Sequence, residues 1–240
     1  GDIGGSSADQ LTMLTVLGAN EHQTAAINEL TTVGSVWPNA QLLQGRALAG
    51  SQSGLTIGSS QVENLVNQST GRFGATLLKS TNLLNSETAA RMNVLSDLIA
   101  LCGQSTQSQA CDQLLALTNS EDTLSAMTSI ARQPWNNAGA LYKLFESSYP
   151  INKATQLRTT ATAPYLLFQP KSFSLSLAFD GGGALALGKL MIDGKGNMWS
   201  GTNWMPGSQS GVVNNIGGGM THFGPGGTPL SPAISGYNGP

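Results

Sequence analysis

Charged residues are scarce in this chain. Asp, Glu, Lys and Arg make up 10% of its 240 residues, whereas an ordinary globular domain contains about 25%. The 11 basic and 13 acidic residues leave a formal net charge of −2 at pH 7. A chain with so little positive charge offers no electrostatic footprint for nucleic acid or for an anionic membrane. We therefore expect neither of them as a partner.

Long apolar runs are also missing. No apolar stretch exceeds a few residues, so we expect no membrane-spanning helix. Neutral Ser, Thr, Asn, Gln and Gly take the place of charge, and such surfaces are common outside the cell. Hence we expect a secreted, cell-surface or periplasmic protein. The chain begins with the flexible sequence GDIGGSS and shows no signal peptide, which indicates a mature or trimmed N terminus.

Cysteine and histidine are limited to two residues each. Cys102 and Cys111 lack the CxxC spacing, and His22 and His222 lie far from them in the sequence, so we expect no zinc site and no other metal or cofactor. The two cysteines form either a disulfide or a pair of buried thiols. We favour the disulfide, which would stabilise the fold by about 2–3 kcal/mol in the chain-entropy model.

The composition changes near residue 150. Residues 1–150 carry 6 basic and 11 acidic residues, whereas residues 151–240 carry 5 basic and 2 acidic ones. The second part also holds 17 of the 30 glycines. These shifts predict three segments: a helical domain over 1–150, an extended linker over 151–172 and a β domain over 173–240.

Helical periodicity dominates the first segment. Met92, Leu95, Ile99 and Cys102 recur at i, i+3, i+7 and i+10, as residues on one face of an α-helix do. Similar stripes follow Cys111, Ser120 and Asn137. The pattern predicts an N-terminal helical bundle in which the disulfide joins two neighbouring helices.

Alternation of apolar and small residues marks the start of the β segment. Phe173–Phe179 has the pattern of a half-buried strand. Two further apolar segments flank the turn from Asp193 to Asn197. The side chains of Asp193 and Asn197 have the spacing of calcium ligands, but the other acidic ligands of a calcium loop do not follow. We therefore expect them to bond the backbone of the turn, with Gly194 and Gly196 at positive φ.

The phrases LMIDGKGNMWSGTN and GGGMTHFGPGGTPLSP resemble a blade of bacterial β-propellers of the NHL-repeat and virginiamycin B lyase-like type. The helical phrases NELTTVGSVW, NVLSDLIALC, CDQLL and IARQPWNNAGALYKL resemble the region that precedes such propellers in large secreted bacterial proteins. The resemblance implies an α+β chain: a helical bundle followed by antiparallel β structure of the propeller-blade type, with Trp199 and Phe223 in the blade core. Since propellers have four to eight blades, this one would be incomplete.

The resemblance also bears on function. Virginiamycin B lyase-like enzymes use histidine and acidic residues with a magnesium ion, whereas the β part here holds only His222, Asp180 and Asp193. We therefore predict no catalytic residues and a non-enzymatic structural or interaction module. It would bind protein partners, or itself, through β edges, for example in an extracellular filament. The alternatives are a fragment of a lyase-like enzyme and a carbohydrate-binding module. The predicted ligand or partner surface consists of Trp204, His222 and Tyr237.

Overall fold

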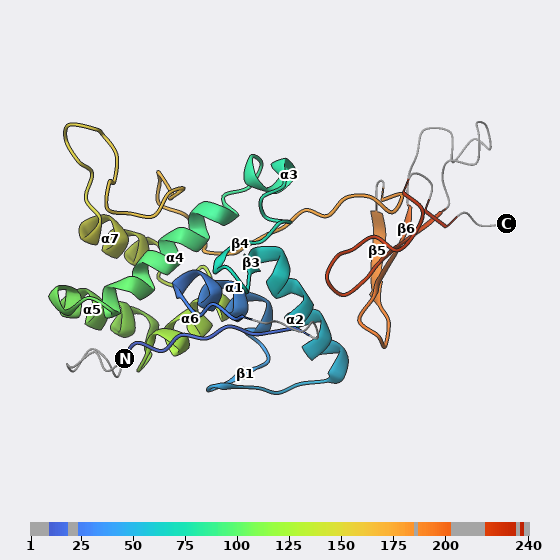
Figure 1. Cartoon of the computed structure of the whole chain (residues 1–240), viewed down its shortest axis with the longest axis horizontal. Helices are drawn as coiled ribbons and strands as arrows, with labels where there is room; N and C mark the ends of the chain where they lie inside the picture. Colours follow the sequence, from blue (N-terminus) through green and yellow to red (C-terminus); the bar gives the residue numbers. More distant parts are fainter. Residues whose placement is uncertain (1–9, 19–23, 185–186, 203–218, 234–235, 238–240) are drawn as a thin grey trace. The chain divides into compact units, whose positions relative to one another are not determined.

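The chain combines helices with small antiparallel sheets in a computed structural model, which confirms the predicted α+β class (Figure 1). The structure describes residues 10–18, 24–184, 187–202, 219–233 and 236–237. Contacts divide the chain into a helical unit, Gly1–Ala49 with Val62–Leu177, and a sheet unit, Gly50–Gln61 with Ala178–Pro240. The segment boundaries at residues 150 and 172 stay predictions.

The elements follow one another in chain order. The helices are α1 (Glu29–Asn39), α2 (Gln52–Leu65), α3 (Ser80–Leu83), α4 (Thr88–Cys102), α5 (Ser108–Thr118), α6 (Thr123–Arg132) and α7 (Ala138–Ser148), with a 3-10 turn at Ser105–Gln107. Two short hairpins pair β1 (Leu43–Gln44) with β2 (Ala47–Leu48), and β3 (Val66–Asn67) with β4 (Arg72–Phe73). The third sheet holds β5 (Leu187–Ile192), β6 (Met198–Thr202) and β7 (Met220–Phe223). None of the helices described is long and apolar enough to cross a membrane.

Helix α4 is the centre of the helical unit, because it contacts α1, α5, α6 and α7 (Figure 1). The predicted stripe that runs from Met92 to Cys102 is buried. Val94, Leu98 and Leu101 lie outside that stripe and are buried as well. Buried residues occur on every side of α4, so other elements surround it, and α4 contributes more core residues than any other described helix.

Capping boxes start two of the helices around α4. Asn28 Oδ1 accepts from Thr31 N at 2.8 Å, and Thr31 Oγ1 accepts from Asn28 N at 2.9 Å, at the start of α1. Asp122 and Ser125 repeat this arrangement at the start of α6. Each box satisfies backbone donors that a helix leaves unpaired at its N terminus. Pro38 lies in the last turn of α1, which ends one residue later.

The predicted strand Phe173–Phe179 does not form. Its alternation still reflects burial, since Phe173 is fully buried and Leu175 and Leu177 pack against the core of the helical unit. The segment remains extended because side chains, rather than a neighbouring strand, bond its backbone. The alternating pattern therefore predicted the buried face of the segment correctly, but the prediction that a neighbouring strand bonds its backbone was wrong.

The segment before it contains a turn and several bends, and its backbone also accepts hydrogen bonds from side chains of the helices. Asn93 Nδ2 donates to Pro164 O at 2.9 Å, and Tyr142 OH donates to Leu166 O at 2.9 Å. Leu166 is buried in the core of the helical unit. We call residues 158–177 the strap, because their backbone is tied to helix side chains along its length.

The resemblance to a propeller blade is wrong. The sheets among the described residues have two or three strands, and they form no propeller or NHL repeat. A propeller blade has four strands, whereas alternating strands around a glycine-containing turn occur in any antiparallel hairpin. Trp199 and Phe223, expected together in a blade core, lie on opposite faces, since Trp199 pairs with His222 and its neighbour Met198 pairs with Phe223. Only Phe223 is buried.

Candidate functional site at the edge of the sheet

Strand β5 forms one edge of the three-stranded sheet, whose order is β5-β6-β7 (Figure 1). Its residues Leu190, Met191 and Ile192 are 60%, 71% and 58% exposed. Successive residues of a strand alternate between the two faces, so β5 exposes apolar side chains on both faces of the sheet. Natural edge strands usually avoid this, because an apolar edge is a template for pairing with another chain.

The ladder shows which backbone groups of β5 point outward. Asp193 N donates to Asn197 O at 3.0 Å at the end of the β5–β6 hairpin. Along an antiparallel ladder, residues whose N–H and C=O groups point toward the paired strand (inward residues) alternate with residues whose groups point away from it (outward residues). Met191, opposite Trp199, therefore turns its N–H and C=O toward β6. The N–H and C=O groups of Leu190 and Ile192 point to the outer edge, where no residue that the structure describes pairs with them.

The opposite edge of the sheet, on β7, is closed. Met220 and Tyr237 exchange two backbone hydrogen bonds of 2.8 Å. Leu230 N donates to His222 O at 2.8 Å, and His222 N donates to Ser231 Oγ at 2.9 Å. These bonds use the outward backbone groups of Met220 and His222. The two edges of the sheet thus differ: Pro229–Ser231 and Tyr237 cover β7, whereas β5 is free among the described residues.

The turn after β5 is organised by the Asp193 carboxylate. It accepts from the backbone of Lys195 and Asn197, from Asn197 Nδ2 and from Trp199 Nε1, all at 2.9–3.0 Å. These hydrogen bonds, the one from Trp199 first, lower the pKa of Asp193 below its ordinary value. Four donors from the hairpin surround the carboxylate, which agrees with the predicted role of Asp193 in the turn. Gly196 has the predicted positive φ, +83°, whereas the prediction of a positive φ at Gly194 was wrong. No cluster that fits a metal ion occurs among the described residues.

The predicted surface residues His222 and Tyr237 lie together on one face of the sheet. His222 stacks on Trp199 with ring centroids 3.7 Å apart, and Tyr237 is 6.1 Å from Trp199. Trp199 was not part of the predicted surface, although its position opposite His222 brings it into the group. Trp204 and His22 lie outside the described residues. Because His222 already covers one face of the Trp199 ring, that face is not available to a stacked sugar.

The disulfide lies in the helical unit. Cys102 and Cys111 are bonded, which confirms the favoured alternative of the sequence analysis. The bond joins the last residue of α4 to α5, and the Cys111 side chain is fully buried. Disulfides persist in oxidising environments and are rare in the cytosol. The bond is therefore consistent with a location outside the cytoplasm.

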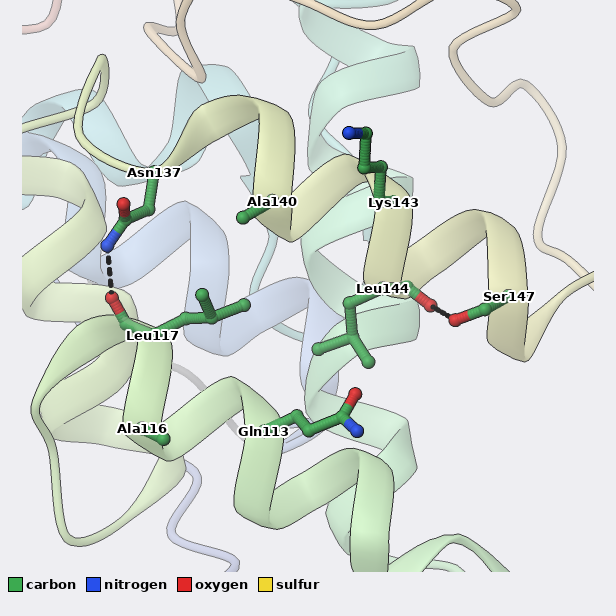
Figure 2. Close-up of a pocket in the computed structure, with 8 residues that line it drawn as sticks. All are labelled: Gln113, Ala116, Leu117, Asn137, Ala140, Lys143, Leu144 and Ser147. Atoms are coloured by element: carbon green, nitrogen blue, oxygen red, sulfur yellow. Dashed lines mark hydrogen bonds between the residues drawn. The ribbon is translucent and has the colours of Figure 1, made fainter.

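A groove between α5 and α7 has a volume of about 660 Å³ (Figure 2). Leu117 and Leu144 contribute to its apolar lining. Its polar side chains are partly engaged: Asn137 Nδ2 donates to Leu117 O at 2.7 Å and Ser147 Oγ donates to Leu144 O at 2.9 Å. Lys143 is the one charged residue in this lining. A single lysine beside apolar side chains makes no catalytic constellation.

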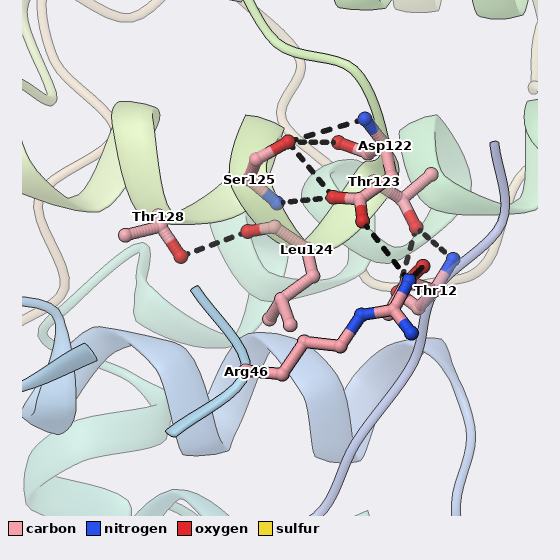
Figure 3. Close-up of polar contacts among 7 residues, drawn as sticks. All are labelled: Thr12, Arg46, Asp122, Thr123, Leu124, Ser125 and Thr128. Carbon is pink, nitrogen blue, oxygen red and sulfur yellow. Dashed lines mark hydrogen bonds and ion pairs between the residues drawn. The ribbon is translucent and has the colours of Figure 1, made fainter. Parts of the chain in front are cut away.

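The polar cluster at the start of α6 is structural (Figure 3). Thr12 N donates to Thr123 Oγ1 at 2.9 Å, and Thr123 Oγ1 donates to Thr12 O at 2.7 Å, which fastens the N-terminal segment to the helix. Burial raises the pKa of Asp122, but hydrogen bonds from Ser125 and Thr12 and the charge of Arg46 outweigh it, so that this pKa is lowered overall. The charged Asp122 therefore serves the helix cap.

Asp97 on α4 is a buried carboxylate, with 5% of its surface exposed. It accepts from Thr162 Oγ1 at 2.6 Å and from Thr162 N at 2.9 Å, so it holds the strap. Burial raises the pKa of Asp97 despite these two hydrogen bonds. Tyr149 OH donates to the backbone O of Asp97 at 2.9 Å. The group thus connects α4, α7 and the strap, and its polar atoms are used in that connection.

Comparison with models of known protein families, with characterised proteins and with solved structures finds no match to this chain. Its function has to be argued from its own geometry. Sequence reasoning named His222 and Tyr237 but missed Leu190, Met191 and Ile192 as the exposed residues of the site. Their apolar character suggested burial, and only the position of β5 at a sheet edge shows otherwise. The prediction of β edges as the binding element was the signal that pointed toward them.

Proposed function

We propose that this chain is a non-enzymatic structural or interaction module that works outside the cytoplasm and associates through the free edge of β5 with protein strands, those of further copies of the chain included. The observation that carries the proposal is the exposure of Leu190, Met191 and Ile192, together with outward backbone groups of Leu190 and Ile192 that no described residue pairs with. An added strand gains affinity from main-chain hydrogen bonds and specificity from the side chains on alternate faces. Strand β5 offers both kinds of contact.

The helical unit supplies the rigid body of this module. Helices α1, α3, α5, α6 and α7 each contact α4, and the disulfide between Cys102 and Cys111 joins α4 to α5. A bonded cysteine pair is typical of secreted and periplasmic proteins, which supports the proposed location. The low content of charged residues, 10% of the chain, supports it too.

The structural roles of several ionisable side chains support the non-enzymatic part of the proposal. Asp97 holds the strap, Asp122 caps α6 and Asp193 organises the β5–β6 turn. Arg158 is 6% exposed and donates to Glu146 Oε1 at 2.6 Å and to the backbone of α7. Groups with perturbed pKa values often mark active sites, but Asp97, Asp122 and Asp193 act on the fold itself. Carbohydrate binding at Trp204 stays a prediction.

Light scattering over a range of concentrations tests the proposal. The weight-average mass of the wild-type chain should rise above the 24.8 kDa of one chain as the concentration increases. Ile192→Lys should keep the monomer mass, because pairing would bury an added charge without a partner. Leu84→Lys is the matched control, since Leu84 is an exposed leucine of the helical unit, and it should associate like the wild type. A wild-type chain that stays monomeric up to its solubility limit overturns the proposal.

A further inference from the structure

We infer that the free edge of β5 binds the same edge of a second copy of this chain, so that two β5 strands pair antiparallel about a two-fold axis at Met191. The inference rests on the proposed function and adds the partner, the register and the size of the assembly. The product is a dimer with one continuous sheet of six strands, in the order β7-β6-β5-β5-β6-β7.

The difference between the two edges of the sheet sets the size of the assembly. Growth into a filament needs two open edges, so that each copy can accept a strand on either side. Here Tyr237, Leu230 and Ser231 bond the outward groups of β7, and among the described strands of this sheet only β5 has an open edge. An edge that pairs with itself forms an isologous contact, which closes at two subunits.

The register follows from the outward backbone groups. In an antiparallel pair, two outward residues that face each other exchange two hydrogen bonds. An axis at Met191 places Leu190 opposite Ile192 of the second copy, and Ile192 opposite Leu190 of the second copy. All four of these residues are outward, so the pairing makes four backbone hydrogen bonds. Met191 faces Met191 of the second copy at a non-hydrogen-bonded position, where facing residues are closest.

Charge complementarity selects the same register. An axis at Met191 places Lys189 opposite Asp193 of the second copy, once on each side of the axis. Asp193 carries its negative charge there, because the hydrogen bonds of the turn lower its pKa. Moving the axis to Leu190 or to Ile192 would place Lys189 or Asp193 opposite a methionine instead. Facing opposite charges stabilise a strand pair, and a charge facing an apolar side chain does not.

The length of the contact is limited at the start of β5. The pairing of β5 with β6 is irregular between Leu187 and Leu190, as in a β-bulge. A bulge on an edge strand interrupts further regular pairing. The apolar part of the contact is therefore confined to Leu190, Met191 and Ile192, and the side chains on both faces are needed for affinity.

Cross-linking through an introduced cysteine tests the register. Facing residues at a non-hydrogen-bonded pair have Cα atoms about 4.5 Å apart, which a disulfide spans. Met191→Cys should therefore give a covalent dimer under mild oxidation. Leu190→Cys is the matched control on the same strand, because its two copies would be offset by two residues, or about 7 Å along the strand, and lie out of reach. The native cysteines do not interfere, since they are bonded to each other.

The outcomes separate this inference from the proposed function. We expect the wild-type mass to reach a plateau at twice the chain mass, and Met191→Cys to cross-link at least tenfold more than Leu190→Cys. Mass that grows beyond the dimer, or equal cross-linking of the two variants, overturns the inference and leaves association through β5 intact. A wild-type chain that does not associate at any concentration overturns both.

Discussion

The Thr88 hydroxyl both donates to Ser176 O, at 2.7 Å, and accepts from Ser176 N, at 3.1 Å. One side chain of α4 thus bonds the strap as a neighbouring strand would. Arg91, one turn further along α4, donates to Ser174 O at 2.7 Å. Extended structure without a sheet is stable here because helix side chains satisfy its backbone and Phe173 enters the core.

Thr88→Val removes both hydrogen bonds and keeps the shape of the side chain. Thr88 is 1% exposed, so we expect the free energy of unfolding to fall by about 1–3 kcal/mol. Chemical denaturation followed by far-UV circular dichroism measures the change. Thr88→Ser keeps the hydroxyl and should lose less than half as much. Equal losses in the two variants would show that packing of the methyl group, rather than hydrogen bonding, holds the strap.

Asp97 gives a pH-dependent prediction. Burial raises the pKa of Asp97 in the folded state, so the folded state holds this proton more tightly than the unfolded state does. The contribution of Asp97 to the free energy of unfolding therefore becomes less favourable as the pH rises from the ordinary pKa of aspartate through the raised pKa of Asp97. Asp97→Asn, which does not titrate, should gain stability relative to the wild type between acidic and neutral pH.

Denaturation of wild type and Asp97→Asn at several pH values measures this difference. Asp97→Ala provides the contrast, because it leaves the Thr162 hydroxyl and amide without their acceptor. It should destabilise the fold by about 1–3 kcal/mol. A gap between wild type and Asp97→Asn that stays constant with pH would contradict the assignment.

Asp193 predicts the opposite pH dependence in the sheet unit. Hydrogen bonds from Trp199 and Asn197 lower the pKa of Asp193 in the folded state. Its stabilising effect is present above the ordinary aspartate pKa and is lost as the pH falls toward the lowered folded value. Asp193→Ala should therefore lower the unfolding midpoint of the sheet at neutral pH, and the gap to the wild type should narrow in acid. The indole signal of Trp199 in near-UV circular dichroism should weaken in the variant at neutral pH.

The disulfide supplies a prediction for the helical unit. Cys102 and Cys111 are nine residues apart in the sequence, and the chain-entropy model gives about 2–3 kcal/mol for closing so short a loop. Cys111→Ser, or reduction of the wild type, should lower the free energy of unfolding by that amount. Thermal unfolding with and without reductant measures it. If reductant lowers the melting temperature of Cys111→Ser as much as that of the wild type, the effect does not come from this bond.

Periodicity predicted the helical part of the fold because burial there follows the local pattern. The stripe at Met92, Leu95 and Ile99 is buried as expected. Phe173–Phe179, which overlaps the end of the strap, was predicted as a strand because alternation indicates which side is buried and not which groups bond the backbone. Phe173 would look the same in the sequence whether its neighbour were a strand or the helix that carries Thr88.

The sequence allowed us to predict that the site is a β edge, but not which strand forms it. A glycine-containing turn between apolar segments predicted the β5–β6 hairpin, and Asp193 takes the predicted role in it. The propeller resemblance failed because hairpins of many folds share this pattern. The exposure of Met191 depends on which strand lies at the edge of the sheet, and the local pattern of residues around Met191 does not reveal the order of the strands. Strand order is set by contacts between residues distant in sequence, such as Met220 and Tyr237.

Amide hydrogen exchange at the edge strand tests the central claim most directly. Exchange rates of Leu190, Met191 and Ile192 are compared in dilute and concentrated protein. The account predicts that the amides of Leu190 and Ile192 exchange at least tenfold more slowly in the concentrated sample, because each then donates to a second copy. The Met191 amide, which points toward β6, should exchange slowly in both samples. Unchanged, fast exchange of Leu190 and Ile192 at high concentration would contradict the claim that the edge of β5 is the binding surface.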